Sequence, residues 1–339
     1  MTNCRLSHTV GGFLLNMHSA LQSPERRSIS VVTPVYNGEA SIAELCRRLG
    51  EVLPRVATQY EIILVNDDSR DRSWEIISEL CSRSSTVRGL NLMRNYGQHN
   101  ALLCGIRAAQ YDVIVTMDDD LQHPPEEIPR LLEQLEQRFD VVYGTPKAEQ
   151  HGFLRALASR ITRLALSMAI GWELAKNVSA FRVFRTRLRE AFAEYHSPFV
   201  SIDVLLTWAT TRIGAITVGF EPRRSGASTY TFRRLLRHAL DMMTGFSTLP
   251  LQLASLIGFS CTLLGIAVFL YVFVRYCLEG SVPGFPFLAS IIAIFSGAQL
   301  FALGVIGEYL ARMHFRTMNQ PPYAIRDTAA AENSKTHSE

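Results

Sequence analysis

The chain has 339 residues, a formal net charge of only +3 and 47% hydrophobic residues. So small a charge gives no nucleic-acid-binding signature, and we expect no nucleic-acid partner. The mean hydropathy of +0.09 predicts a soluble part joined to a membrane part. The six cysteines are scattered and form no Cys-x-x-Cys pair, which argues against a structural zinc site or a disulfide framework and is typical of a reducing compartment.

The first 27 residues contain no convincing signal peptide, because their apolar stretch from Val10 to Leu15 is short and holds two glycines. We expect residues 1–27 to form a flexible extension. Met17 is an alternative start that the sequence does not exclude.

From Ser28 to Thr145 the sequence alternates between short apolar runs and amphipathic segments. The predicted strands are 28–37, 60–69, 87–93, 111–120 and 139–145, and the predicted helices are 41–56, 71–81, 101–110 and 124–138. The runs are almost continuously apolar, as in strands covered on both faces. This pattern predicts a doubly wound, mostly parallel α/β sheet. Polar motifs follow three strands at Asn37, Asp67 and Asp118, so we expect them at one edge of the sheet, where such folds bind ligands.

The second half of the chain contains two long uncharged runs. Leu251 to Val274 has 24 residues without a charge, and Phe285 to Gly307 has 23. Each would span roughly 35 Å as a helix, enough to cross a bilayer. The alternative is a buried helix pair. Because the outer flanks are basic, we expect a transmembrane hairpin within 249–312 with both ends in the cytoplasm, followed by a cytoplasmic tail over 313–339.

Two further segments have basic and apolar faces. The first covers about 152–172, within the catalytic domain expected over 28–230, and the second covers 231–248. Both are predicted to lie on an anionic membrane surface, and the alternative is an ordinary helix facing the core.

Residues 118–120 are three consecutive aspartates, which repel one another unless a cation lies among them. Along an extended strand Asp118 and Asp120 point to one side and Asp119 to the other. Asp118 and Asp120 therefore form a candidate site for Mg²⁺ or Mn²⁺. The open coordination positions of such an ion suit a diphosphate. Asp119 is expected to face a nucleotide ribose or solvent.

Four motifs occur in order: VVTPVYN, VNDDSRD, RNYGQHNALLCG and MDDDLQHPPEEIP. Together with RRSGASTYTFRRLL and GAQLFALGVIGEYLAR, they resemble family 2 glycosyltransferases of the GT-A fold, and within them the polyprenyl-phosphate branch. The resemblance covers roughly residues 28–323. It implies that a single sugar is transferred, with inversion, from a nucleoside-diphosphate sugar (a UDP-sugar is favoured) to undecaprenyl phosphate. The reaction would serve cell-envelope glycans such as lipopolysaccharide at the bacterial inner membrane, and the enzyme would be a homo-oligomer such as a tetramer.

The resemblance also assigns roles to individual residues. The nucleotide-sugar would be bound by Pro34, Tyr36, Asn37, Val65, Asp67, Asp118 and Asp119. The metal would be held by Asp118, Asp120 and Gln122. Asp120 and Arg182 would be the catalytic residues, with Arg182 touching phosphate or seating the acceptor. The lipid phosphate would be met by Arg155, Arg223, Ser228 and Tyr230.

The chain departs from the family pattern in three places. Asn66 and Asp68 stand where many members have Asp and Gly, and Gly38 stands where many have Glu. An acidic residue that often precedes the Phe181–Arg182 pair is missing, since this stretch has Asn177 and Ala180, so no general base can be named there. A polyprenyl phosphate is already anionic, so the reaction does not require a base. The alternatives are a non-catalytic homologue that binds lipid-linked sugars, and a processive polysaccharide synthase, which would carry a Gln-x-x-Arg-Trp motif that this sequence lacks.

Overall fold

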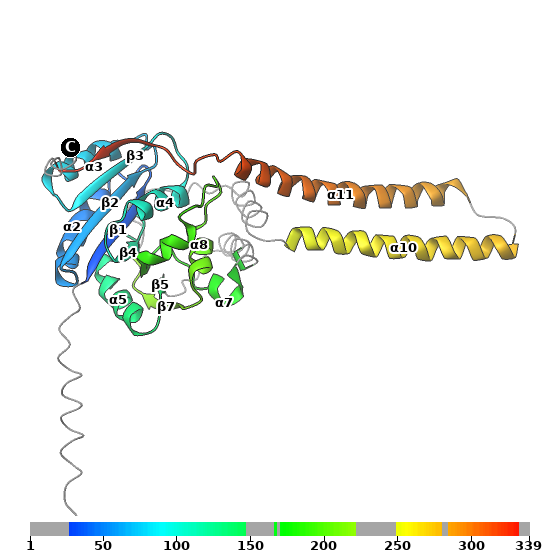
Figure 1. Ribbon diagram of the computed structural model, residues 1–339, viewed down its shortest axis with the longest axis horizontal. Helices are drawn as coiled ribbons and strands as arrows, with labels where there is room; N and C mark the ends of the chain where they lie inside the picture. Colours follow the sequence, from blue (N-terminus) through cyan, green and yellow to red (C-terminus); the bar gives the residue numbers. More distant parts are fainter. Residues whose placement is uncertain (1–26, 147–165, 168–169, 222–248, 280–283, 332–339) are drawn as a thin grey trace, which may run out of the picture.

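The computed structural model describes residues 27–146, 166–167, 170–221, 249–279 and 284–331 (Figure 1). Its strands are β1 (Ser28–Val35), β2 (Gln59–Asn66), β3 (Val87–Leu92), β4 (Val113–Thr116), β5 (Val141–Pro146), β6 (Arg182–Arg185), β7 (Ile213–Val218) and β8 (Ile325–Ala329). Its α-helices are α2 (Ile42–Val52), α3 (Ser73–Arg83), α4 (Gln98–Ala108), α5 (Ile128–Gln137), α7 (Trp172–Ala175), α8 (Ile202–Ala209), α10 (Leu249–Glu279) and α11 (Phe285–Thr317). Three 3₁₀ turns are η1 (Leu53–Arg55), η2 (Pro125–Glu127) and η3 (Thr186–Phe192).

The strands form an eight-stranded sheet in the order β7-β5-β6-β4-β1-β2-β3-β8. Strands β1 to β4 pair in parallel, as do β5 and β7. Strand β6 lies antiparallel between β4 and β5, and β8 lies antiparallel beside β3. The prediction of a mostly parallel α/β sheet is confirmed, and its first five strands are found close to their expected positions.

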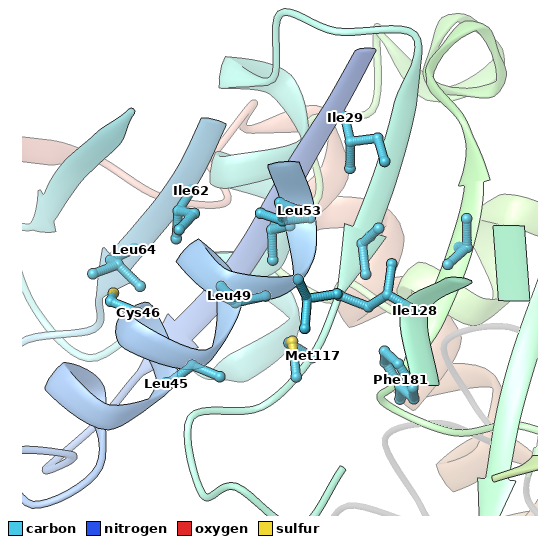
Figure 2. Packing of buried hydrophobic residues seen from close by; sticks show 14 of the residues in the cluster. Ile29, Leu45, Cys46, Leu49, Leu53, Ile62, Leu64, Met117, Ile128 and Phe181 are labelled. Carbon is cyan, nitrogen blue, oxygen red and sulfur yellow. The ribbon is translucent and has the colours of Figure 1, made fainter. Parts of the chain in front are cut away.

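Helices cover both faces of this sheet, as the doubly wound prediction requires. On one face Leu45 and Leu49 of α2 pack with Ile62 and Leu64 of β2 (Figure 2). On the other face Ile63, which lies between those two β2 residues, joins a second core beneath α4 and α8. Successive strand residues thus enter opposite cores, which explains why the strands read as continuous apolar runs.

Helices α10 and α11 lie side by side and project away from the sheet (Figure 1). They include the candidate membrane spans Leu249–Leu278 and Ile294–His314, neither of which is buried within the protein. Large side chains such as Phe269 and Leu300 are 66% and 70% exposed. Leaving each in water would cost about 1.5–3 kcal/mol relative to burial, so a lipid environment accounts for these surfaces better than water does. The helices approach closely at Gly265, where a Cβ would lie 2.8 Å from the Phe295 ring.

The region after α11 differs from the expected simple tail. Helix α11 continues to Thr317, and Ile325–Ala329 then joins the sheet as β8 at the edge beside β3 (Figure 1). The chain therefore returns from the second long helix to the domain from which it left. The extension over 1–26, the segment 231–248 and most of the segment 152–172 lie outside the described residues.

Candidate functional site

The predicted polar motifs meet at the carboxyl edge of the parallel strands. The backbone N–H of Asp67 donates to the carbonyl of Val35, and that of Met117 donates to the carbonyl of Val32, at 2.9 and 3.3 Å. Since β2 and β4 flank β1, the segments 36–38, 67–69 and 117–122 are neighbours in space. The expectation that these motifs share one edge is confirmed.

Asn37 joins two of these segments through its backbone and side chain. Its N–H donates to Ser69 Oγ at 3.0 Å, and its Oδ1 accepts from the N–H of Arg70 at 2.9 Å. Asn37 and Asp68 both have left-handed backbones, with φ of 55° and 56°, which Asn and Asp tolerate better than most residues. Of the residues predicted to line the nucleotide pocket, Tyr36 is 49% exposed, whereas Pro34 and Val65 are buried.

Asp67 is an anchor for the loop before α4. Its two carboxylate oxygens accept hydrogen bonds from the N–H groups of Tyr96 and Gly97 at 2.7 and 2.8 Å, and the residue is 3% exposed. Burial raises the pKa of Asp67, and the two backbone bonds oppose that rise. Gly97 has φ of 95° and precedes α4, so the carboxylate fixes the start of this helix. The structure thus gives Asp67 a positioning role, and direct nucleotide contact stays a prediction.

The three aspartates lie in a turn and not on an extended strand. Strand β4 ends at Thr116, residues 119–120 form a turn, and Leu121 has φ of 60°. Strand alternation therefore does not apply to Asp118 and Asp120, and the premise of that prediction is wrong. Aspartate is depleted in strands and favoured in turns, which agrees with the strand ending before the three aspartates.

Each aspartate of this turn has a different neighbour. Asp118 Oδ1 accepts a hydrogen bond from Gln98 Nε2 at 2.6 Å. Asp119 reaches the loop after β1, where a Cβ on Gly38 would lie 2.0 Å from its Oδ2. Asp120 Oδ1 accepts from the N–H of Gln122 at 3.1 Å. All three residues are partly exposed at the edge of the sheet, although Asp119 Oδ2 itself is buried.

These carboxylates suit a hard divalent cation that is shared with a substrate. Oxygen ligands favour Mg²⁺ or Mn²⁺, and such ions often use one or two carboxylates and complete their shell with phosphates and water. Within the described residues no group of three His, Cys, Asp or Glu side chains forms a closed metal cage. The donor set therefore fits an ion that arrives with an anionic ligand better than a permanent structural metal.

Arg182 lies beneath the edge and not on its surface. It is 1% exposed, its Nε donates to Thr116 Oγ1 at 2.9 Å, and its Nη1 pairs with Asp203 of α8. Asp203 also accepts a hydrogen bond from the Tyr143 hydroxyl at 3.0 Å. Burial lowers the pKa of Arg182, but the adjacent Asp203 raises it above its ordinary value, so the guanidinium stays charged. Through Thr116, the last residue of β4, this arrangement supports the start of the aspartate turn. The expected contact of Arg182 with phosphate or acceptor stays a prediction.

His123 packs with two aromatic rings beside the turn. Its ring lies 5.5 Å from that of Phe181 and 5.6 Å from that of Phe220, measured between centroids, and its Nε2 lies 3.4 Å from Ser179 Oγ. Burial lowers its pKa, and the nearby Asp120 opposes this effect.

Sequence reasoning missed a charged bridge next to the site. Arg48 of α2 donates to both oxygens of Glu126 at 2.9 and 2.5 Å and to Glu221 at 3.1 Å. The N–H of Glu221 donates to the carbonyl of Gln122 at 2.9 Å. Glu221, the last described residue before 222–248, therefore lies against the aspartate turn. Arg155, Arg223, Ser228 and Tyr230 themselves lie outside the described residues.

Comparisons with known proteins agree with the resemblance to family 2 glycosyltransferases that the sequence motifs indicate. The profile of glycosyl transferase family 2 matches residues 30–195. Undecaprenyl-phosphate 4-deoxy-4-formamido-L-arabinose transferase of Pseudomonas aeruginosa is 36% identical over 310 residues, covering 90% of this chain and 91% of its own. The enzyme of the same name from Shewanella sediminis is 34% identical, over 91% of this chain and 94% of its own.

Among solved structures, glucosyl-3-phosphoglycerate synthase of Mycobacterium tuberculosis, in complex with Mn²⁺ and UDP-glucose, is similar with a TM-score of 0.47. It is 18% identical and covers 71% of this chain and 83% of its own.

Proposed function

Because the chain belongs to glycosyltransferase family 2 and is a glycosyltransferase, we propose that it transfers one sugar from a nucleoside-diphosphate sugar to a polyprenyl phosphate such as undecaprenyl phosphate. The observation that carries this proposal is the presence, in one chain, of a partly exposed aspartate turn at the sheet edge and of two long helices whose apolar side chains are exposed. The relatives named for undecaprenyl-phosphate substrates, similar over nine-tenths of the chain, support the acceptor class.

In this proposal the donor lies along the carboxyl edge, with its base near Tyr36 and its diphosphate near Asp118 and Asp120. A bound Mg²⁺ or Mn²⁺ would neutralise the diphosphate charge, with Gln122 as a neutral ligand. Gln98 orients Asp118, and the Gln122 backbone orients Asp120, through the hydrogen bonds described above. A UDP-sugar is the favoured donor.

The acceptor phosphate supplies its own nucleophile. One of its anionic oxygens attacks the anomeric carbon as the bond to the diphosphate breaks, and in-line attack inverts that carbon. The protein then has to align the two partners and stabilise the departing diphosphate. This accounts for a site without a carboxylate base before Arg182. Arg155, Arg223, Ser228 and Tyr230 are proposed to meet the lipid phosphate.

The membrane arrangement follows from the same proposal. Two spans return the chain to the side from which it entered, which agrees with the position of β8 in the sheet. The basic residues flanking the spans favour the cytoplasm for that side. We propose a multi-pass protein of the bacterial inner membrane with a cytoplasmic catalytic domain, assembled as a homo-oligomer.

The test is a transfer assay with purified protein in membranes. UDP-, GDP- and dTDP-sugars carrying a label are offered with undecaprenyl phosphate and either Mg²⁺ or Mn²⁺. The wild type should produce lipid-linked label from one donor, and chelation of the metal should abolish it. Asp120→Asn should reduce transfer at least about 100-fold, the scale of losing one electrostatic group at a reacting centre. Asp112→Asn is the matched control, because Asp112 lies before β4, at the opposite end from Asp120. The absence of label with every donor, or undiminished label with Asp120→Asn, would refute the mechanism.

A further inference from the structure

The strand that follows the second long helix begins beside the carboxyl ends of the parallel strands, where the donor is proposed to bind. Strand β8 pairs with β3 in a register that places Asp327 opposite Asn91, which itself lies opposite Asn66 at the end of β2. Just before β8, the carbonyl of Ala324 accepts from the N–H of Met93 at 2.9 Å. Residues separated by more than 230 positions in the sequence are therefore neighbours beside the loop that contains Asp67.

A row of side-chain hydrogen bonds crosses the three strands. Asn66 Nδ2 donates to Asn91 Oδ1 at 2.8 Å, and Asn91 Nδ2 donates to Asp327 Oδ2 at 3.1 Å. Asn66 and Asn91 are 2% and 5% exposed. An amide can both accept from Ser69 N–H, as Asn66 Oδ1 does at 3.4 Å, and donate to Asn91, whereas an ionised aspartate at position 66 could only accept. The asparagine at position 66, a departure from the family pattern, thus has a structural partner.

The second departure in the same loop also has a partner from β8. Arg326 Nη2 lies 3.5 Å from Asp68 Oδ1 and donates to the carbonyl of Met93 at 2.6 Å. Asp68 has the left-handed backbone at which the family pattern has glycine, so its side chain introduces both strain and charge. The guanidinium compensates the charge and joins the loop after β2 to the loop after β3.

We propose that β8 is part of the donor site, and that Arg326 and Asp327 are positioning residues for the nucleotide. Arg326 holds Asp68 and the loop after β3, and Asp327 holds the Asn91–Asn66 pair. Between those two attachments lies Asp67, whose carboxylate fixes the start of α4. The inference rests on the proposed function, because it takes this edge as the binding site of a nucleoside diphosphate. It adds positioning residues that come from the segment beyond the second membrane span.

The test measures nucleotide affinity separately from transfer. Binding of UDP, GDP and dTDP to the full-length protein in detergent is followed by calorimetry, and donor and acceptor KM are measured in the transfer assay. Arg326→Ala and Asp327→Ala should each weaken binding of the preferred nucleotide about 3- to 10-fold, the effect of about 0.7–1.4 kcal/mol. Donor KM should rise in parallel, whereas acceptor KM and kcat should change less than about 2-fold.

A double-mutant cycle separates positioning from a general loss of stability. Because Asp68→Gly restores a relaxed left-handed residue and removes the partner of Arg326, adding Arg326→Ala to it should produce less than half of the effect that Arg326→Ala has alone. Arg326→Lys should recover part of the affinity. The control is Arg83→Ala, which breaks an exposed pair with Glu79 on α3 and should leave nucleotide binding unchanged.

Each outcome bears on one of the two proposals. Unchanged nucleotide affinity in both β8 variants, or an additive cycle with Asp68→Gly, would overturn the inference. Nucleotide binding that is sensitive to Arg326, but no transfer by the wild type from any donor, would support the inference about β8 and overturn only the proposed reaction. A wild type that binds none of the three nucleotides would overturn both.

Discussion

Replacing Arg48 by methionine tests whether the aspartate turn and the predicted acceptor segment are held together by one side chain. Methionine keeps the unbranched apolar stem within α2 and removes the guanidinium. The variant loses two hydrogen bonds to Glu126 and one to Glu221, whose backbone is bonded to Gln122. We expect Glu221, which leads into the predicted acceptor segment, to be held less firmly. The hydrogen bonds of Asp118 and Asp120 should remain.

The size of the effect follows from exposure of the three side chains. Arg48 is only 10% exposed, but Glu126 and Glu221 are 50% and 34% exposed, so both carboxylates can regain water when the guanidinium is removed. A charge-assisted bond contributes about 1.5–3 kcal/mol when shielded and about 0.2–1 kcal/mol at the surface. For the forked contact with Glu126 and the single contact with Glu221 together we expect a loss of about 2 kcal/mol. In a domain of this size that lowers the midpoint of thermal unfolding by about 4–8 °C.

The assay compares KM for polyprenyl phosphate with KM for the donor. Arg48→Met should raise the acceptor KM about 5- to 10-fold and change the donor KM by less than about 2-fold, since about 1–1.4 kcal/mol of the loss falls on acceptor positioning. Arg47→Met is the matched control, because Arg47 is 55% exposed and its ion pairs among the described residues are with Glu44 and Glu51 of the same helix. An acceptor KM equal to that of the wild type, or an identical rise in both Michaelis constants, would refute the coupling.

Three further predictions concern the edge itself. Gly38→Ala places a Cβ 2.0 Å from Asp119 Oδ2, so the carboxylate must move. We expect at least a 10-fold loss of transfer, roughly the scale of misplaced catalytic groups. Gly50→Ala is the control and should keep full activity, because a Cβ at Gly50 meets open space. Asp67→Asn sets an amide N–H₂ against a backbone N–H, which should cost about 1.5–3 kcal/mol of unfolding free energy and weaken donor binding; equal chemical denaturation of variant and wild type would contradict this. Burial lowers the pKa of His123, so the unfolded chain takes up this proton first; the associated stability should fall as the pH drops below the ordinary value of 6.5, and His123→Gln should flatten that part of the pH–stability curve.

Much of the catalytic domain could be predicted because its strands are buried on both faces. Runs such as residues 62–65 and 113–115 are continuously apolar and are followed by polar residues, so both their strand character and the position of the site could be inferred. The residues at which these strands end could be predicted less accurately. Strand β4 stops at Thr116, four residues earlier than expected, because aspartate is depleted in strands and favoured in turns.

The antiparallel strands β6 and β8 have no comparable signal in the sequence. Arg182–Arg185 has only four residues, two of them arginines, and Ile325–Ala329 is a short, largely exposed edge strand. Their positions depend on tertiary pairing with β4, β5 and β3, which local periodicity does not encode. For the same reason the partners of Asn66 and Asp68 could not be inferred, since Asp327 and Arg326 lie at the far end of the chain.

The short connection between α11 and β8 limits how far the catalytic edge can rise from the membrane. Eight residue steps separate Thr317 from Ile325, and a fully extended chain of this length reaches about 26–29 Å at most. The usable length is smaller, because Pro322 is buried and Tyr323 packs against the second core. In the proposed membrane arrangement, this connection therefore keeps the sheet edge within reach of a lipid headgroup. Lengthening the connection should separate the reaction from the lipid surface without changing any residue of the pocket.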